Sequence, residues 1–244
     1  MKPARGNGPT RGLAAVLAGA VAVALAVVLY FVLGAFVHRP TAAPEGDTYG
    51  AAPSYALTDQ HGRSFSSSAL RGKIQVVSFL FPYCTTYCPL TTRVLAETEQ
   101  LADSAGLSGA VAFVAFNVDP EGAGPAELTA FLRQERVDPD DSDWHYLTGS
   151  PDQIRRVVTG GFHVFYQKIS LSDEQKAEAE EKAHGDYSPQ PTEPNPLADR
   201  AQVNYDVVHH DAIEIVDSHG IIRHIFNGSR VTPRQILTAV QEAG

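Results

Sequence analysis

Two cysteines are the residues of this sequence with the clearest chemistry. Cys84 and Cys88 are separated by three residues and directly follow an apolar run. On helical geometry their α-carbons would lie about 6.2 Å apart, within the usual range for a disulfide, with both sulfurs on one side of the turn. The pair is therefore suited either to a disulfide or to binding a metal ion.

Cys84 and Cys88 lie just before the start of an expected helix, a position that makes thiols more reactive. Unpaired amides and the dipole at a helix N-terminus lower a thiol pKa, and the thiolate is the form that binds metals and attacks disulfides. A plain stabilising disulfide is the alternative, although so short a loop restricts the unfolded chain little. With only two cysteines in the chain, four-cysteine zinc and iron–sulfur sites are excluded.

Nine histidines are available as a third ligand. His209 and His210 form a pair just before an expected strand, and the ends of adjacent strands in an α/β sheet meet at one edge. Neighbours on a strand point to opposite faces, so the spacing does not choose between them. The other histidines stand singly in expected flanks, turns, loops or elements: His38, His61, His145, His163, His184, His219 and His224.

Two cysteines and a histidine are soft and borderline ligands that suit copper(I), copper(II) or zinc. A structural zinc ion normally takes a fourth protein ligand, and no further cysteine is present, so copper is favoured. Asp119 also follows an apolar run and is either an ordinary turn residue or a residue beside the site.

The elements that must position these residues alternate between strands and helices. Residues 74–81 and 110–118 are apolar runs typical of buried strands, and residues 90–102 and 125–136 have helical spacing. A right-handed crossover then makes the two strands parallel neighbours, which indicates an α/β class. Further expected elements are a hairpin over 55–68, a helix over 151–159, strands over 162–169, 212–216 and 221–226, and a helix from Pro233 with a capping box of Thr232 and Gln235.

The alternation breaks from Ser170 to Asn204. This stretch is first acidic and then rich in proline. Such composition favours an exposed loop inserted at residues 170–204.

The N-terminal part predicts a membrane anchor. Residues 13–37 carry neither charge nor proline and are long enough to cross a bilayer as a helix. A cleavable signal peptide is the alternative, but its apolar region is usually shorter. Lys2, Arg5 and Arg11 precede the span, which places residues 1–12 in the cytoplasm by the positive-inside rule.

The remainder of the chain would then lie outside the cytoplasm. Residues 38–53, rich in Ala, Pro and Gly, indicate a tether, and residues 54–244 an extracytoplasmic domain. We therefore expect a single-pass protein of a bacterial cell membrane. The formal net charge of −9 and the absence of clustered cations exclude a general nucleic-acid binder.

From about Ala51 onward the chain resembles the Sco/SenC family of membrane-anchored copper proteins. The resemblance rests on the cysteine pair followed by Pro89 and on four short stretches: LTDQHG at 57–62, LRGK at 70–73, VDPE at 118–121 and LTGSP at 147–151. It implies a thioredoxin-like fold, with a central mixed sheet flanked by helices. Thioredoxins themselves, with two residues between their cysteines, and peroxiredoxins fit this spacing less well.

The resemblance also implies the ligands of one copper ion, Cu(I) or Cu(II). Residues 208–211 match a Val-Asp-His-Ser-like stretch of the family, which assigns the ligand role to His210 beside Cys84 and Cys88, with His209 in place of the usual aspartate. Between the cysteines, residues 85–87 (TTY) replace a Pro-Asp-Val-like triplet, a change that removes no ligand.

The function implied is that of a copper metallochaperone. Family members help to assemble the binuclear copper site of cytochrome c oxidase, so the expected partner is the oxidase subunit with that site, or another copper protein. Such a carrier needs no turnover of a substrate. The alternatives are a thiol-disulfide oxidoreductase that uses Cys84 and Cys88 to keep the acceptor's cysteines reduced, and a copper or redox sensor.

Overall fold

The structure is a computed structural model that describes residues 48–184 and 190–244. The predicted cytoplasmic residues 1–12, the membrane span 13–37 and most of the tether lie outside these ranges. Among the helices that the structure does describe, none combines the length and apolar character needed to cross a membrane.

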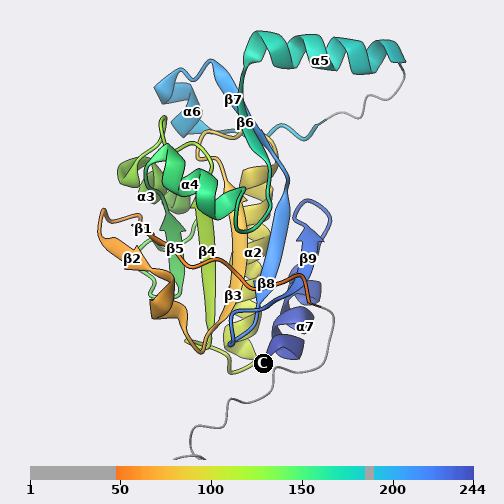
Figure 1. Ribbon diagram of the computed structural model, residues 1–244. Helices are drawn as coiled ribbons and strands as arrows, with labels where there is room; N and C mark the ends of the chain where they lie inside the picture. The colour runs from red at the N-terminus through yellow and green to blue at the C-terminus, as the bar shows by residue number, and fades with distance from the viewer. Residues whose placement is uncertain (1–47, 185–189) are drawn as a thin grey trace, which may run out of the picture. The chain divides into compact units, whose positions relative to one another are not determined.

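A five-stranded mixed sheet forms the centre of the domain, in the order β5-β4-β3-β8-β9 (Figure 1). The strands β3 (Ile74–Leu80), β4 (Val111–Asn117) and β5 (Trp144–Leu147) are parallel, and β8 (Ala212–Val216) and β9 (Ile222–Asn227) add two antiparallel pairings. Every residue of β3 and β4 is buried, because helices cover the sheet on both faces. The predicted α/β class and the parallel pair are confirmed.

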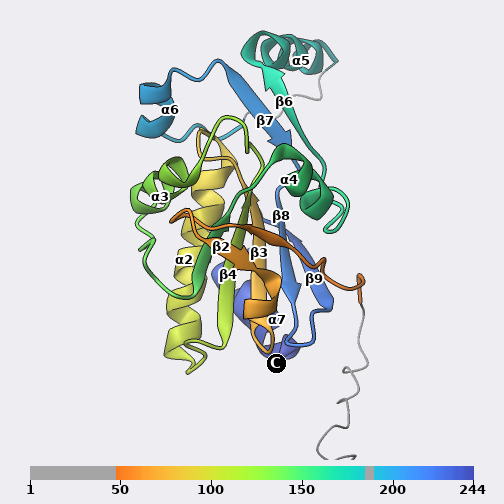
Figure 2. The same ribbon diagram turned by 60° about the vertical axis from the view of Figure 1, so that its left-hand side comes forward.

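Helices pack on the two faces of this sheet (Figures 1 and 2). In Figure 1, α2 (Tyr87–Ser104) lies behind the sheet and α4 (Pro151–Val158) in front of it. The helix α7 (Pro233–Ala243) packs beside α2 and begins with the predicted capping box, and α3 (Pro125–Gln134) connects β4 to β5. Thus α2, which contains Cys88, packs against the sheet and against α7 beside it.

The predicted hairpin is also present. The strands β1 (Ala56–Thr58) and β2 (Ser64–Ser66) pair across a turn in which Gly62 has a φ of +78°, and the short 3-10 helix η1 (Ser67–Leu70) follows. The strand β5 was not predicted, because it has only four residues and includes the polar His145.

The expected loop at 170–204 contains two helices instead. The strand β6 (Tyr166–Ser170) leads into α5 (Leu171–His184). The helix α6 (Pro196–Ala201) follows, beyond residues 185–189, which lie outside the described ranges. Because α5 has polar residues on all sides, it gave no periodic signal. It is nevertheless rich in good helix formers, and ion pairs between residues three or four apart, such as Lys176 with Asp173, support it.

The strands β6 and β7 (Tyr205–His209) form an antiparallel ribbon separate from the central sheet. Tyr166 pairs with His209 and Ser170 with Tyr205, and the ribbon runs beyond the upper end of the sheet in Figure 1. The histidine pair lies just before the 212–216 strand, as expected. His209 is also the last residue of β7, a strand that was not predicted, so the ribbon decides where it lies.

Part of the expected tether belongs to the domain. The N–H of Tyr49 donates to Ile222 O at 2.9 Å, and that of Ala52 donates to Gly220 O at 2.8 Å. Ala51 forms a β-bridge with Ile221. The backbone therefore joins the domain several residues before the predicted boundary at residue 54.

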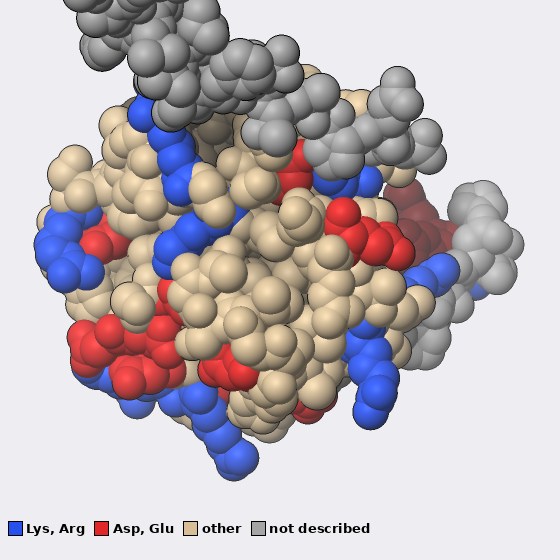
Figure 3. Space-filling view, turned by 90° about the horizontal axis from the view of Figure 1, so that it is seen from below, with Lys and Arg blue, Asp and Glu red and all other residues tan. Residues whose placement is uncertain are grey.

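The face of the molecule seen from below shows no single sign of charge. In Figure 3, Lys and Arg side chains alternate with Asp and Glu side chains around a largely uncharged centre. The negative net charge is therefore not concentrated on this face.

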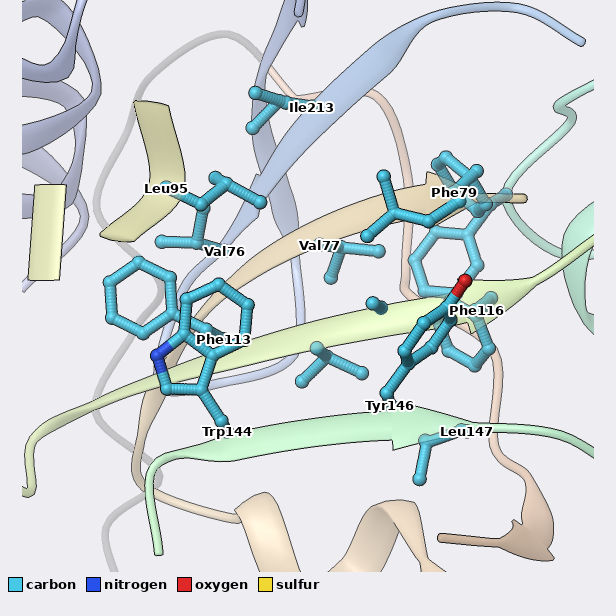
Figure 4. Close-up of a cluster of buried hydrophobic side chains, with 14 of the residues drawn as sticks. Val76, Val77, Phe79, Leu95, Phe113, Phe116, Trp144, Tyr146, Leu147 and Ile213 are labelled. Atoms are coloured by element: carbon cyan, nitrogen blue, oxygen red, sulfur yellow. The ribbon is translucent and has the colours of Figure 1, made fainter. Parts of the chain in front are cut away.

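Aromatic side chains fill the core between the sheet and its helices (Figure 4). Phe113 stacks on Trp144 with ring centroids 5.2 Å apart, and Phe116 stacks on Phe79 at 5.9 Å. All four side chains are at most 2% exposed. This packing makes β3 and β4 a rigid base for the loop that starts at Phe81.

One carboxyl group is buried in the sheet. Glu214 in β8 lies between Val77 and Ile225 on the neighbouring strands and is 1% exposed. Its Oε2 has no hydrogen-bond partner among the described residues. Burial raises the pKa of Glu214 from its ordinary value of 4.5 to about 7.

This buried carboxyl predicts a specific pH dependence of stability. The folded state holds the proton of Glu214 more tightly than the unfolded state, so its contribution makes the free energy of unfolding fall as pH rises from about 4.5 to about 7. A Glu214→Gln variant should lose this fall and be more stable than the wild type above pH 7. Urea unfolding at pH 5 and pH 8 measures the difference.

The control is Glu97→Gln, which changes an exposed carboxyl on α2. It should follow the wild-type pH dependence. Equal stability changes at pH 5 and pH 8 in Glu214→Gln would contradict the prediction.

Candidate metal centre

The two cysteines lie where β3 passes into α2. The Cys84 N–H donates to Phe81 O at 3.0 Å, which closes a turn after the strand, and Cys88 stands in the first turn of α2. The two residues are 5% and 1% exposed, and both thiols are free. The loop and the helix thus bring two buried thiols to one place, as the sequence predicts.

The N-terminus of α2 is directed at the sulfur of Cys84. The N–H groups of Thr86 and Cys88 donate to Cys84 Sγ at 3.4 and 3.5 Å. Thr86 occupies the N-cap position without a capping hydrogen bond of its own, and its Oγ1 lies 3.2 Å from the same sulfur. Cys84 Sγ therefore takes the place that a capping oxygen usually fills.

These contacts separate the two thiols in acidity. A hydrogen bond from the Cys88 thiol, together with the Thr86 hydroxyl and the two amides, lowers the pKa of Cys84 to about 7 in spite of its burial. The hydrogen bond to Cys84, and then burial, raise the pKa of Cys88 well above its ordinary value. Of the two thiols, Cys84 is therefore the one that ionises near neutral pH, whereas Cys88 keeps its proton.

His209 lies beside these thiols. Its Nε2 is 3.5 Å from Cys88 Sγ, and its Nδ1 is 3.1 Å from His210 O. A carbonyl oxygen only accepts, so Nδ1 carries the hydrogen and Nε2 presents its lone pair to Cys88. Burial lowers the pKa of His209, which keeps the imidazole neutral, the form that binds metals.

His210, the histidine that the resemblance singled out, lies elsewhere. It is exposed, its ring is 6.2 Å from that of Phe165, and its N–H donates to Phe165 O at 3.1 Å. Neighbours along a strand point to opposite faces. The ribbon register therefore brings His209, and not the predicted His210, to the thiol of Cys88.

Asp119 anchors the ribbon that carries His209. This carboxylate is 3% exposed and accepts hydrogen bonds from Tyr205 Oη at 2.7 Å and Lys168 Nζ at 3.3 Å. Lys168 lies on β6 and Tyr205 on β7, so both strands are tied to the end of β4. A Cβ at Gly122 would lie 2.1 Å from both Asp119 Oδ2 and Tyr205 Oη, so the network requires glycine there.

Neither Lys168 nor Tyr205 was identified from the sequence. Each reaches the site only through the register of the ribbon, and no local pattern around them indicates a buried carboxylate partner. Asp119 was expected to be either a turn residue or a residue beside the site. Its carboxylate accepts hydrogen bonds from Lys168 and Tyr205 of the ribbon and not from the thiols.

A second contact fixes the end of the ribbon. Thr91 Oγ1 in α2 donates to Asp211 Oδ1 at 3.2 Å, and the Ser229 N–H donates to the other oxygen of the same carboxylate. Asp211 directly follows the histidine pair. The chain beside His209 is thus tied to the helix that carries Cys88.

Cys84 and His209 line a cavity of about 360 Å³ between the start of α2, α5 and β7. Across the described ranges 48–184 and 190–244, no three His, Cys, Asp or Glu side chains lie close enough to hold a metal ion as they stand. The donor set of two sulfurs and a neutral imidazole fits a soft metal ion, so binding requires these side chains to close around it.

Comparison with known proteins identifies the family. The SCO1/SenC family model matches residues 43–188, which include both cysteines and end before His209. The SCO1 protein homolog of Bacillus subtilis is 26% identical over 121 residues, which make up 49% of this chain and 61% of that protein. This alignment thus spans less than two thirds of the relative.

Solved structures share the fold. ScoI of Bradyrhizobium japonicum with copper bound has a TM-score of 0.57 and 21% identity, over 80% of this chain and 99% of that chain. BsSco, in which a disulfide switch was identified and which belongs to the Sco family of cytochrome c oxidase assembly proteins, has a TM-score of 0.57 and 21% identity, over 81% and 96%. The predicted thioredoxin-like fold with a central mixed sheet is therefore present.

The family model covers more than half of the chain, including the strand, loop and helix that hold the cysteines, and the sheet superposes on those of solved Sco proteins. The chain belongs to the SCO1/SenC family.

Proposed function

We propose that this domain binds one copper ion through Cys84, Cys88 and His209 and delivers it to the copper-site subunit of a cytochrome c oxidase. The observation that carries the proposal is the neutral imidazole whose Nε2 lone pair faces the thiol of Cys88, next to Cys84. Sulfur and imidazole donors suit copper(I) and copper(II). The copper bound to Bradyrhizobium japonicum ScoI supports the choice of metal.

The three proposed ligands differ in their protonation before the metal binds. Cys84 ionises near neutral pH, because the Cys88 thiol and the amides of α2 stabilise its thiolate. Cys88 must lose its proton when the metal binds, so binding releases a proton. His209 is held by the hydrogen bond from its Nδ1 to His210 O, which fixes the orientation of the ring.

Three protein ligands leave room for an acceptor to approach. A ligand of the acceptor enters from the cavity beside Cys84 and His209, and the three donors are then displaced in turn. If copper enters and leaves in the same oxidation state, both cysteines return to thiols and no other oxidant or reductant is needed. The proposed setting is the outer face of a bacterial cell membrane, with residues 13–37 as the anchor.

The ligand assignment is tested by replacing the two neighbouring histidines separately. Loss of a direct ligand in His209→Ala should weaken copper(I) binding by the full chain at least about 10-fold, since even partners behind the ligands contribute that much to metal affinity. His210→Ala should bind as the wild type does. Anaerobic titration against a competing copper(I) chelator measures both affinities.

Cys84→Ser and Cys88→Ser serve as positive controls and should both bind more weakly than His210→Ala. Weak binding by His210→Ala together with unchanged binding by His209→Ala would overturn the assignment.

A second function, thiol-disulfide exchange, is favoured by the acidity of Cys84. Its pKa of about 7 makes it a good attacking thiol near neutral pH, and Cys88 is placed to resolve a mixed disulfide. The disulfide switch identified in BsSco supports this alternative. In that function the domain would reduce the acceptor's cysteines, and His209 would bind no metal.

Oxidase assembly in the source cells separates the two functions. The His209→Ala variant then replaces the wild-type protein in the cells. If the protein is a copper carrier, the copper site of the oxidase should stay empty. If it is an oxidoreductase, that site should be filled as in wild-type cells. The optical spectrum and copper content of the purified oxidase give the result. The reaction of the reduced variant with oxidised glutathione should in both cases proceed within about 3-fold of the wild-type rate, because the thiols remain.

A further inference from the structure

The segment that precedes β7 holds the loop between the cysteines. Asn195 Nδ2 donates to Pro82 O at 2.9 Å and to Cys84 O at 2.8 Å, and the Glu193 N–H donates to Thr85 O at 2.7 Å. Three carbonyls of the loop therefore bind to residues more than 100 positions later in the chain. We call residues 193–197 the strap.

The side chain of Asn195 is fully hydrogen-bonded and only 2% exposed. Its Oδ1 accepts from the N–H groups of Leu197 and Ala198 at 3.0 and 3.1 Å, which caps α6, and from Gln134 Nε2 at 3.2 Å. An amide is suited to this place because it donates from one end and accepts at the other. An aspartate would keep the cap but could not bind the two carbonyls when ionised.

The strap is fixed to the rest of the domain as well as to the loop. Arg93 of α2 pairs with Glu193 Oε2 at 2.6 Å and with Glu135 Oε2 at 3.0 Å. Glu135 follows α3 and is 6% exposed. The strap thus links the loop to both α2 and α3.

The two cysteines differ in what holds them. Cys88 belongs to α2 and is positioned by the helix, whereas Cys84 lies in irregular chain whose carbonyls have no partners in a sheet or helix. At Thr86 the backbone angles, with φ of −122° and ψ of −99°, are neither helical nor extended. The position of Cys84 therefore depends on contacts from outside the loop.

We propose that Asn195 is a positioning residue for the metal centre. By holding the carbonyls of Pro82 and Cys84, it fixes the loop so that Cys84 Sγ meets the amides of α2 and the thiol of Cys88. The chain then continues from the strap through α6 into β7 and His209. The segment from the strap to β7 thus places both Cys84 and His209. This role rests on the proposed function only where copper is concerned.

The test uses the metal-free full chain and the variant Asn195→Asp. Two lost hydrogen bonds at about 1 kcal/mol each predict alkylation of Cys84 by iodoacetamide at least about 10-fold faster than in the wild type at the same pH. Fragment mass spectra distinguish Cys84 from Cys88. Amide hydrogen exchange should rise in residues 82–86 and stay unchanged in β4, whereas general loosening of the fold would raise both.

Gln134→Ala is the matched control, because it removes a hydrogen bond to Oδ1 of the same side chain and leaves both donors in place. It should react as the wild type does. Wild-type alkylation and exchange rates in Asn195→Asp would overturn the proposal. If that variant does not fold, Glu193→Pro provides a second test, because proline removes the single donor to Thr85 O. Alkylation of Cys84 should then be about 5-fold faster than in Glu193→Gln. Equal rates in these two variants would overturn the proposal.

Copper(I) provides a separate second measurement. Dissociation from Asn195→Asp into excess chelator should be about 10-fold faster than from the wild type, because the loop opens more often. If the wild type binds no copper, the proposed function fails, whereas the alkylation and exchange rates still decide the role of the strap.

Discussion

The first amides of α2 have no carbonyl partners within the helix, and Cys84 Sγ accepts two of them. The rest of the site depends on this interaction. It stabilises negative charge on a buried sulfur, and it does so only while the loop keeps that sulfur in line with the helix. The burial of β3 supplies a fixed start for the loop, and the packing of α2 against α7 supplies a fixed axis for the helix.

Three structural units meet at the thiols. The central sheet and α2 hold Cys88, the strap holds the loop of Cys84, and the β6–β7 ribbon holds His209. Each unit is tied to the others by a polar group with several partners: the buried Asp119 for the ribbon, the half-buried Asp211 for the end of the ribbon and the buried Asn195 for the loop. Since such a group is costly to leave unpaired, each junction favours a single arrangement.

The cavity beside the thiols gives the site the access that the proposed copper transfer requires. Cys84 is buried and His209 is half-buried, and both line the cavity bounded by α5 and β7. The hydrogen bond to Cys84, and then burial, raise the pKa of Cys88 and keep it protonated, so the proposed metal binding would be coupled to proton release. The inserted segment therefore forms part of the wall of the site as well as its support.

The sequence by itself determined the α/β class, the parallel β3–β4 pair and the cysteines at the start of α2, because burial and helix periodicity act over neighbouring residues. It left open which histidine faces the thiols, since adjacent residues on a strand differ only in the face they take, and the family motif favoured His210. Only the pairing of Tyr166 with His209 and the anchoring by Asp119 decided for His209. Likewise α5 has no apolar face, and Asn195 meets its partners only in the folded chain, so neither the helix nor the strap has a local signal.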